Sequence, residues 1–433
     1  MSISKKPYRG TRDFYPKQMK VRQYIFEKVK KAMEVFSYEQ YDGPLLEEVE
    51  LYKAKSGEEL INEQIYSFID RGNREVAIRP EMTPTLARMV ASVHRETPKP
   101  IRWYSIPNLM RYEKPQKGRL REHWQINADI FGAPKDFGEI EVLQLLIYLF
   151  KSFGASEKQF KIYINDRFFV DAFFSQFLKL SNDQTYKLYK IVDKSKKVTS
   201  EKLLTMIHGL TEDSSQRSAI EEYVKINDFN NLESFAEKYE LRDSLDSLLF
   251  LKDSLKKQNL DHFIQYDPTI VRGLDYYTGL VFEVFDLNPE NKRALCGGGS
   301  YQNLLKIFNE PAVPGIGFGL GDVTLTDFLV THNLLPELTQ STTQVLFASI
   351  DNDSISYMST WVQKLRDEGI NVELYPFIAK PKKVMNYALK KGIHHISIIG
   401  NNEKELEKIE IKNLLTRESS SVESIEEIIS FLK

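Results

Sequence analysis

The segment with the clearest chemical potential is a cationic loop between two strand-like stretches, at residues 111–121. Pro115 and Gly118 predict a turn within it, and Lys and Arg side chains crowd around that turn. Arginine suits phosphate groups because its planar guanidinium can bind two oxygens at once. From composition alone, a solvated hairpin with a charged tip and an anion-binding loop are equally good interpretations of this segment.

The residues that follow alternate as in a strand with one polar face. Gln125, Asn127 and Asp129 fall on one side, whereas Ile126 and Ala128 fall on the other. Three polar side chains in a row are costly to bury without partners, so this face is expected to present polar groups to a ligand.

Glycine-rich segments further along could bring the backbone close to a ligand. Glycines flank a tyrosine pair within 271–279, and denser runs lie at 297–299 and 315–321. Such glycines allow a flat or phosphorylated ligand to approach, although they also mark bulges and tight packing. Neither run matches the dinucleotide fingerprint or a P-loop, which argues against nicotinamide and P-loop enzymes.

Metal and disulfide chemistry find little support in the residue types. The chain has one cysteine, Cys296, and its seven histidines show no metal-like spacing. One cysteine cannot form an internal disulfide or a Cys-rich zinc site. Lysine clusters at 194–197 and 380–383 are expected to be solvated faces, with contact to a phosphate backbone as the alternative.

Composition bounds the class of protein. The 433 residues predict two to four domains at about 150 residues each. With 59 Lys+Arg against 61 Asp+Glu, the net charge of -2 excludes a protein coated in positive charge but allows local basic patches. No apolar run approaches the ~18 residues of a membrane helix, and no signal peptide is visible, so a cytoplasmic globular protein without a membrane segment is expected.

The residue composition and periodicity change along the chain, and these changes predict which helices and strands position the residues described above. Residues 1 to about 160 mix short strands (75–80, 100–104) with amphipathic helices, the clearest at 21–36. Residues 166–262 nearly lack Gly and Pro and are expected to be helical, with one helix starting near 211–213. Strands then return at 266–328, so the helical block is interpreted as an insertion.

A polar linker at 338–344 precedes a last region of strand–helix alternation. Strands are expected at 345–350, 372–375 and 395–399, with helices ending near 369 and spanning 382–391. This alternation predicts a separate domain with a small parallel α/β sheet.

Taken together and in this order, these segments resemble the histidyl-tRNA synthetases of the class II aminoacyl-tRNA synthetase group. The resemblance runs from Arg9–Phe14 to the end of the chain and is strongest at Arg79–Thr83, Arg111–Asp129 and Arg272–Tyr277. It implies an α+β catalytic domain at 1–165 and 263–335, an antiparallel sheet flanked by helices. It also implies a helical insertion domain at 166–262, contacting the tRNA acceptor end, and an α/β anticodon-binding domain at 343–433.

The activity implied by the resemblance is that of an aminoacyl-tRNA ligase. Such an enzyme activates L-histidine with ATP and Mg²⁺ to histidyl-adenylate, then transfers histidine to its cognate tRNA. The resemblance further implies a homodimer and no prosthetic group, and it assigns no protein ligands to the magnesium.

Site residues carry over position by position from the resemblance. Arg111 would grip the ATP α-phosphate and the histidine carboxylate, and Arg272 would stabilise charge on the α-phosphate. The implied catalytic residues are Arg272, Arg111 and Gln125. The implied nucleotide-binding residues are Arg111, Glu113, Arg119 and Gly319. The implied histidine-binding residues are Glu81, Thr83, Gln125, Asp129, Arg272, Tyr276, Tyr277 and Tyr301.

The sequence departs from the family pattern in three places. Gly321 and Asp322 stand at the positions matched to the Glu-Arg of motif 3, whose arginine stacks on adenine. An acid near the triphosphate would be unfavourable unless it binds magnesium or points away, so Asp322→Arg is expected to tighten ATP binding or to have no effect. Ser300 replaces the arginine of the Gly-Gly-Gly-Arg pattern, and Asp129 is one methylene shorter than the usual glutamate.

Two other functions compete with this one. One is a non-catalytic synthetase paralogue acting as regulatory subunit of ATP phosphoribosyltransferase in histidine biosynthesis. That family generally lacks the C-terminal domain present here from Val345 and tends to lose the cationic loop. The other is an inactive tRNA sensor, which need not keep Arg111 and Arg272 together. The sequence favours the synthetase.

Overall fold

The computed structural model describes residues 3–54, 60–271, 277–338 and 341–432. The chain divides into two compact units, Met1–Leu335 and Pro336–Lys433. Within the described residues, no helix is both long enough and apolar enough to span a membrane.

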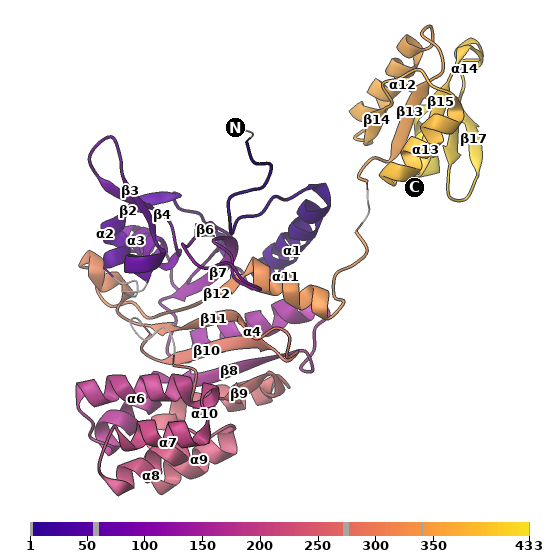
Figure 1. Cartoon of the computed structure of the whole chain (residues 1–433). Helices are drawn as coiled ribbons and strands as arrows, with labels where there is room; N and C mark the ends of the chain where they lie inside the picture. Colours follow the sequence, from indigo (N-terminus) through magenta and orange to yellow (C-terminus); the bar gives the residue numbers. More distant parts are fainter. Residues whose placement is uncertain (1–2, 55–59, 272–276, 339–340, 433) are drawn as a thin grey trace. The chain divides into compact units, whose positions relative to one another are not determined.

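A large sheet runs through the middle of the N-terminal unit (Figure 1). Its strands run in the order β1-β5-β7-β12-β11-β10-β8-β9, with β6 paired to β7, and every pair is antiparallel except β1–β5 and β8–β9. The antiparallel sheet expected for this region is confirmed. The strands are β1 (Glu39–Gln40), β5 (Ile101–Ser105), β6 (Asn108–Met110), β7 (Glu122–Phe131), β8 (Phe160–Asp166), β9 (Ile264–Tyr266), β10 (Leu280–Asp286), β11 (Ala294–Tyr301) and β12 (Gly315–Gly321).

One face of this sheet is covered by helices. Helix α4 (Phe137–Ser152) packs on β12 and on α1 (Pro16–Val35), and it is apolar on almost every side. The amphipathic helix expected at 21–36 is confirmed as part of α1, with Ile25 and Val29 among its buried residues. Because Ile126, Ala128 and Ile130 of β7 are buried in this same core, the polar residues between them must face the opposite side.

The helical block leaves the sheet after β8 and returns as β9 beside it. The helix expected to start near 211–213 is confirmed as α8, capped by the carboxylate of Asp213. The block shares one hydrophobic core with the sheet, and Phe169 meets Tyr266 of β9 edge-on at 6.4 Å between ring centroids. Its helices are α5 (Arg167–Asp171), α6 (Asn182–Lys194), α7 (Ser200–His208), α8 (Ser214–Tyr223), α9 (Phe229–Lys238) and α10 (Asp246–Lys256).

A second, smaller sheet lies beside the first in the N-terminal unit (Figure 1). It has the order β2-β4-β3 and carries α2 (Val49–Lys53) and α3 (Thr83–Val93). The strand expected at 75–80 is confirmed, though it ends at residue 78 and leaves the following segment to lead into α3. The strands are β2 (Leu46–Glu48), β3 (Tyr66–Ile69) and β4 (Glu75–Ile78).

The C-terminal unit is a five-stranded sheet with helices, in the order β14-β13-β15-β16-β17. The three expected strands are confirmed and are parallel, but the expectation of a wholly parallel sheet is wrong, because β16 and β17 run antiparallel to their neighbours. A parallel crossover needs a dozen or more residues, and the links into β16 and β17 are shorter. The elements are β13 (Val345–Ser349), α12 (Ile355–Asp367), β14 (Val372–Leu374), α13 (Pro381–Lys391), β15 (His395–Ile399), α14 (Asn401–Glu405), β16 (Ile409–Asn413), β17 (Ser419–Val422) and α15 (Ile425–Leu432).

Phe160 is expected to be a principal stability determinant of the N-terminal unit. Its ring stacks on Phe150 of α4 at 4.6 Å and on Phe263 at 5.1 Å, which joins the sheet to the segment that ends the helical block. Phe160→Ala should lower the free energy of unfolding by about 3–5 kcal/mol in urea denaturation. Phe250→Ala is the matched control, because Phe250 is 55% exposed, and a loss of equal size there would contradict the prediction.

Candidate active site

Two neighbouring cavities open on the polar face of β7. The smaller has a volume of about 240 Å³ and the larger about 780 Å³. Their common lining lies between them, so two ligands bound side by side would meet there. The shared residues are Arg111, Gln125, Glu283, Gly297 and Gly319.

The smaller cavity gathers most of the polar residues predicted from sequence. They come from β7, from the segment that leads into α3, and from the strand end at Tyr301. Arg272 and Tyr276 lie outside the described residues. The predicted residues brought together here are Glu81, Thr83, Arg111, Gln125, Asp129, Tyr277, Tyr301 and Gly319.

Asn127 lines the same cavity, although sequence analysis did not name it as a site residue. Its signal was present, because it stands between Gln125 and Asp129 in the strand alternation. Its side chain is buried, and its amide donates a hydrogen bond to the Gln125 backbone oxygen at 3.2 Å. The polar row of β7 is therefore continuous.

The glycines of β12 exist to accommodate this polar row. Gly317 pairs with Asp129 and Gly319 with Asn127 across the two strands, and the Gln125 side chain lies over Gly319. A Cβ at Gly317 would lie 1.8 Å from the Asp129 Oδ1, and one at Gly319 would lie 2.7 Å from the Gln125 Nε2. Of the two interpretations left open for these glycines, tight packing holds at Gly317 and Gly319, because the protein's own side chains lie against them, although both glycines also line the smaller cavity.

Asp129 is the buried acid of the smaller cavity. It is 5% exposed, and the Tyr301 hydroxyl donates to its Oδ1 at 2.6 Å. Burial raises the pKa of Asp129 to about 7, while the hydrogen bond from Tyr301 acts in the opposite direction. A ligand that offers an N–H donor here would satisfy an acceptor that water hardly reaches.

Arg111 is fixed at the boundary between the cavities. It follows β6, and its Nε donates to the Pro80 backbone oxygen at 2.8 Å. This bond ties the cationic loop to the segment that carries Glu81 and Thr83. The guanidinium is thus oriented before any ligand arrives, which lowers the cost of binding an anion.

The rest of the cationic loop lines the larger cavity. Backbone hydrogen bonds between Gln116 and Arg119, each 2.9 Å, close its turn, with Gly118 at φ +72°. Glu113 is buried and forms an ion pair with Arg119. The loop is therefore part of a cavity wall, which favours the anion-binding interpretation over the solvated hairpin.

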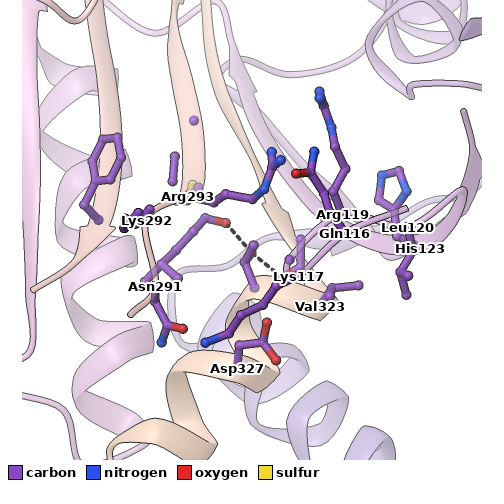
Figure 2. Close-up of a pocket in the computed structure, with 18 of the residues that line it drawn as sticks. Gln116, Lys117, Arg119, Leu120, His123, Asn291, Lys292, Arg293, Val323 and Asp327 are labelled. Carbon is purple, nitrogen blue, oxygen red and sulfur yellow. Dashed lines mark hydrogen bonds between the residues drawn. The ribbon is translucent and has the colours of Figure 1, made fainter. Parts of the chain in front are cut away.

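The opposite wall of the larger cavity contains residues that sequence analysis did not single out. Figure 2 shows Arg293, at the start of β11, across from Lys117 and Arg119 of the loop. His123 of β7 also faces the cavity, and burial, with Arg111, Arg12 and Arg119 nearby, lowers its pKa to about 3. His123 is therefore neutral. Its place in the β7 alternation was the signal that could have found it.

Part of the lysine cluster at 194–197 reaches the site as well. Lys197 lines the larger cavity from the helical block, and Lys196 pairs with the buried Asp267 at 2.5 Å. Both side chains are nevertheless exposed, at 54% for Lys196 and 53% for Lys197, as expected for a solvated face.

Asp322 does not line either cavity. It begins α11 (Asp322–Thr331) and is 3% exposed. Its Oδ1 accepts from the Trp124 backbone N–H at 2.9 Å and its Oδ2 from Arg12 at 2.7 Å. Of the alternatives that the sequence left open, Asp322 therefore points away from the cavity, and Asp322→Arg would bury a second cation beside Arg12.

Ser300 also points elsewhere. Its hydroxyl donates to Glu139 at 2.7 Å, and it is absent from the linings of both cavities. The departure at this position therefore leaves both cavities unchanged.

Residues 10–325 match the histidyl-tRNA synthetase family model, and residues 344–433 match that of an anticodon binding domain. The chain belongs to the histidyl-tRNA synthetase family. The histidine–tRNA ligase of Leptospira biflexa is 44% identical, over 95% of this chain and 93% of that protein.

Solved structures of this family share the fold. Histidyl-tRNA synthetase from a Nostoc species superposes with a TM-score of 0.82 at 22% identity, over 99% of this chain and 100% of that one. A Bacillus halodurans protein, described as an ATP phosphoribosyltransferase regulatory subunit/histidyl-tRNA synthetase, gives 0.74 at 20%, over 89% and 97%. The expected fold class, an α+β class II synthetase with a C-terminal anticodon-binding domain, is confirmed.

Gly317 and Gly297 offer a matched pair for testing the packing of β12. Gly317→Ala should lower the free energy of unfolding by about 1–3 kcal/mol because its Cβ would overlap the Asp129 carboxylate. At Gly297, on the neighbouring strand, the nearest atom to a Cβ is 3.9 Å away, so Gly297→Ala should change stability little. Thermal unfolding of both variants is the measurement, and equal losses would contradict the packing described here.

Burial of Asp129 predicts a pH dependence of stability. Its folded pKa of about 7 lies above the ordinary aspartate value of about 3.9, so the folded state keeps a proton that the unfolded state releases. The stability from this group is present below pH 4 and is lost as pH rises through 7. The melting temperature of the free protein should therefore fall more steeply between pH 5 and 8 than that of Asp129→Asn. Parallel curves would rule out the raised pKa.

Proposed function

We propose that this chain is a histidine–tRNA ligase, which activates L-histidine with ATP and transfers it to the cognate tRNA. The observation that carries the proposal is the pair of adjoining cavities, one polar and closed by the buried Asp129, the other cationic. They share Arg111 and Gln125 at their boundary. The name and 44% identity of the Leptospira relative support the same activity.

Histidine would occupy the smaller cavity. Asp129 and Tyr277 would hydrogen-bond the imidazole nitrogens, and Tyr276 and Tyr301 would line its pocket. Since Asp129 is buried, an apolar amino acid would leave its carboxylate unsatisfied, and such sites discriminate strongly without editing.

The other end of the amino acid would be held near the cavity boundary. Glu81, Thr83 and Gln125 would bind the ammonium and carboxylate groups. The Gln125 side chain lies over Gly319 of β12, where a Cβ would be 2.7 Å from its Nε2, so the amide has a fixed position at that boundary.

Adenylation would take place at the shared boundary. A histidine carboxylate oxygen attacks the α-phosphorus, and the bond from that phosphorus to the bridging oxygen of pyrophosphate breaks. Arg111 would contact both reacting groups, and Arg272 would stabilise charge on the α-phosphate. A guanidinium already held by a backbone oxygen stabilises the transition state without reorganising.

The nucleotide would extend into the larger cavity along the cationic loop. Glu113 and Arg119 would meet it there, together with Gly319. In the second step the terminal ribose hydroxyl of the tRNA attacks the histidyl carbonyl carbon, and AMP leaves. Closing the two ligands into adjoining cavities supplies the proximity that both steps need.

Magnesium would arrive with ATP as part of the substrate, and no prosthetic group is proposed. Among the described residues, no three His, Cys, Asp or Glu side chains cluster as a metal site. The carboxylates that line the larger cavity are Glu113, Glu283, Glu290 and Asp327. Protein ligands of the magnesium stay unassigned.

The proposed organisation follows the family. The catalytic domain would comprise 1–165 and 263–335, with an insertion domain at 166–262 for the tRNA acceptor end and an anticodon-binding domain at 343–433. The enzyme would work in the cytoplasm as a homodimer. Exposed apolar side chains on the small sheet, Phe68 at 48% and Ile69 at 61%, support a protein interface.

The regulatory-subunit alternative is less well supported. The chain keeps the segment matched to an anticodon-binding domain, and its cationic loop lines a cavity with Arg111 and Arg119 in place. A regulatory subunit generally lacks the C-terminal domain and tends to lose the cationic loop. An inactive tRNA sensor would keep the C-terminal domain but need not keep Arg111.

Histidine-dependent exchange between ATP and pyrophosphate tests the proposed function. The unaltered chain should catalyse exchange, and Arg111→Ala should lower kcat/KM by about 100- to 1000-fold, since one preorganised donor to the transition state is lost. Arg272→Ala serves as a second inactive reference. Folded protein whose exchange does not exceed that of Arg272→Ala would favour the regulatory alternative.

A further inference from the structure

The larger cavity lacks an arginine from the motif 3 helix. Asp322 points away from it, and the residue of the first turn of α11 that faces it beside Val323 is Thr324. Thr324 carries no charge, and its hydroxyl donates to the Leu295 and Gly321 backbone oxygens at 3.2 Å. A guanidinium that packs on the nucleotide base would therefore come from another element.

Arg293 reaches the place next to Thr324. A Cβ at Gly118 would lie 3.0 Å from the Arg293 Cδ and 3.5 Å from the Thr324 Cγ2, so both side chains meet the loop at the same point. Gly118 lets the loop lie this close, because any side chain there would displace Arg293. The guanidinium projects into the larger cavity, as Figure 2 shows.

The other cations of this cavity have different positions or shapes. Among the described lining residues, the arginines are Arg111, Arg119 and Arg293. Arg111 stands at the shared boundary and Arg119 lies on the cationic loop, whereas Arg293 lies beside Thr324 of α11. The lysines present point charges rather than planes, so they cannot stack on a ring as a guanidinium does.

The place of Arg293 along the cavity indicates which part of ATP it meets. The α-phosphate must lie at the boundary with the smaller cavity, where the carboxylate attacks. Arg293, Gly118 and Thr324 line the larger cavity but not the smaller one. They therefore stand away from the reacting phosphate.

We propose that Arg293 packs its guanidinium on the adenine ring of ATP and replaces the motif 3 arginine from a different strand. This inference rests on the proposed function, since it assigns a binding residue for the ATP of that reaction. The guanidinium over adenine would then come from the β10–β11 hairpin. In synthetases with the usual motif 3, it comes from the motif 3 arginine.

The test uses the full chain in histidine-dependent exchange, with adenosine as a competitive inhibitor that has no phosphates. Arg293→Ala and Arg293→Gln should raise the KM for ATP and the inhibition constant of adenosine by the same factor, about 2- to 30-fold for a lost cation–π contact. The KM for histidine should not change. Arg293→Lys should recover only part of the affinity, because an ammonium keeps the cation–π attraction but not the planar stacking.

Arg242→Ala is the matched control, since Arg242 lies in the helical block with its side chain 46% exposed and should behave as the unaltered chain. An unchanged inhibition constant for adenosine would overturn the proposal, whether or not the KM for ATP rises, and so would full recovery by Arg293→Lys. These outcomes differ from failure of the proposed function, in which the unaltered chain itself shows no exchange.

Discussion

The pairing of a polar strand with a glycine strand is the constraint on which the rest of this site depends. β7 presents Gln125, Asn127 and Asp129 on one face, and β12 places Gly317 and Gly319 where two of those side chains lie across it. Neither strand would be stable beside an ordinary neighbour. Larger residues in β12 would overlap the Asp129 carboxylate. Without β12 packed closely beside β7, the polar row would be exposed to water.

From this pair the two cavities follow. The polar face of β7 lines both cavities, so a single strand carries the acid of the smaller cavity and the neutral His123 of the larger one. Arg111 sits between them because the loop after β6 is tied to the segment before α3. Charge is concentrated where ligands would carry the opposite sign, while the net charge of the chain stays near zero. That balance limits nonspecific attraction to nucleic acid without weakening the local site.

Ion pairs outside the cavities stabilise the fold rather than bind ligands. Arg12 and Asp322 join the N-terminal segment to the start of α11, and the same carboxylate accepts from the Trp124 backbone N–H. Lys196 of the helical block forms an ion pair with Asp267, four residues before Val271. Both acids look chemically available in the sequence. Both are in fact buried structural partners.

Much of the fold followed from sequence because local patterns decide it. The alternation in β7 assigned its faces correctly, and the apolar stripe of α1, the helical block and the first three C-terminal strands were all predicted from periodicity and turn residues. The antiparallel β16 and β17 were missed, since strand direction depends on connection length and pairing partners rather than on periodicity.

What the sequence by itself determined about this protein is which residue types stand at which spacing, and hence its family and the polar face of β7. Only the tertiary structure decided where the side chains point. It turned Asp322 away from the cavity, filled the glycine spaces with Asp129 and Gln125, and brought Arg293 beside Thr324. The physical reason is that such contacts join residues far apart in the chain, and their distances are set by the packing of whole strands and helices.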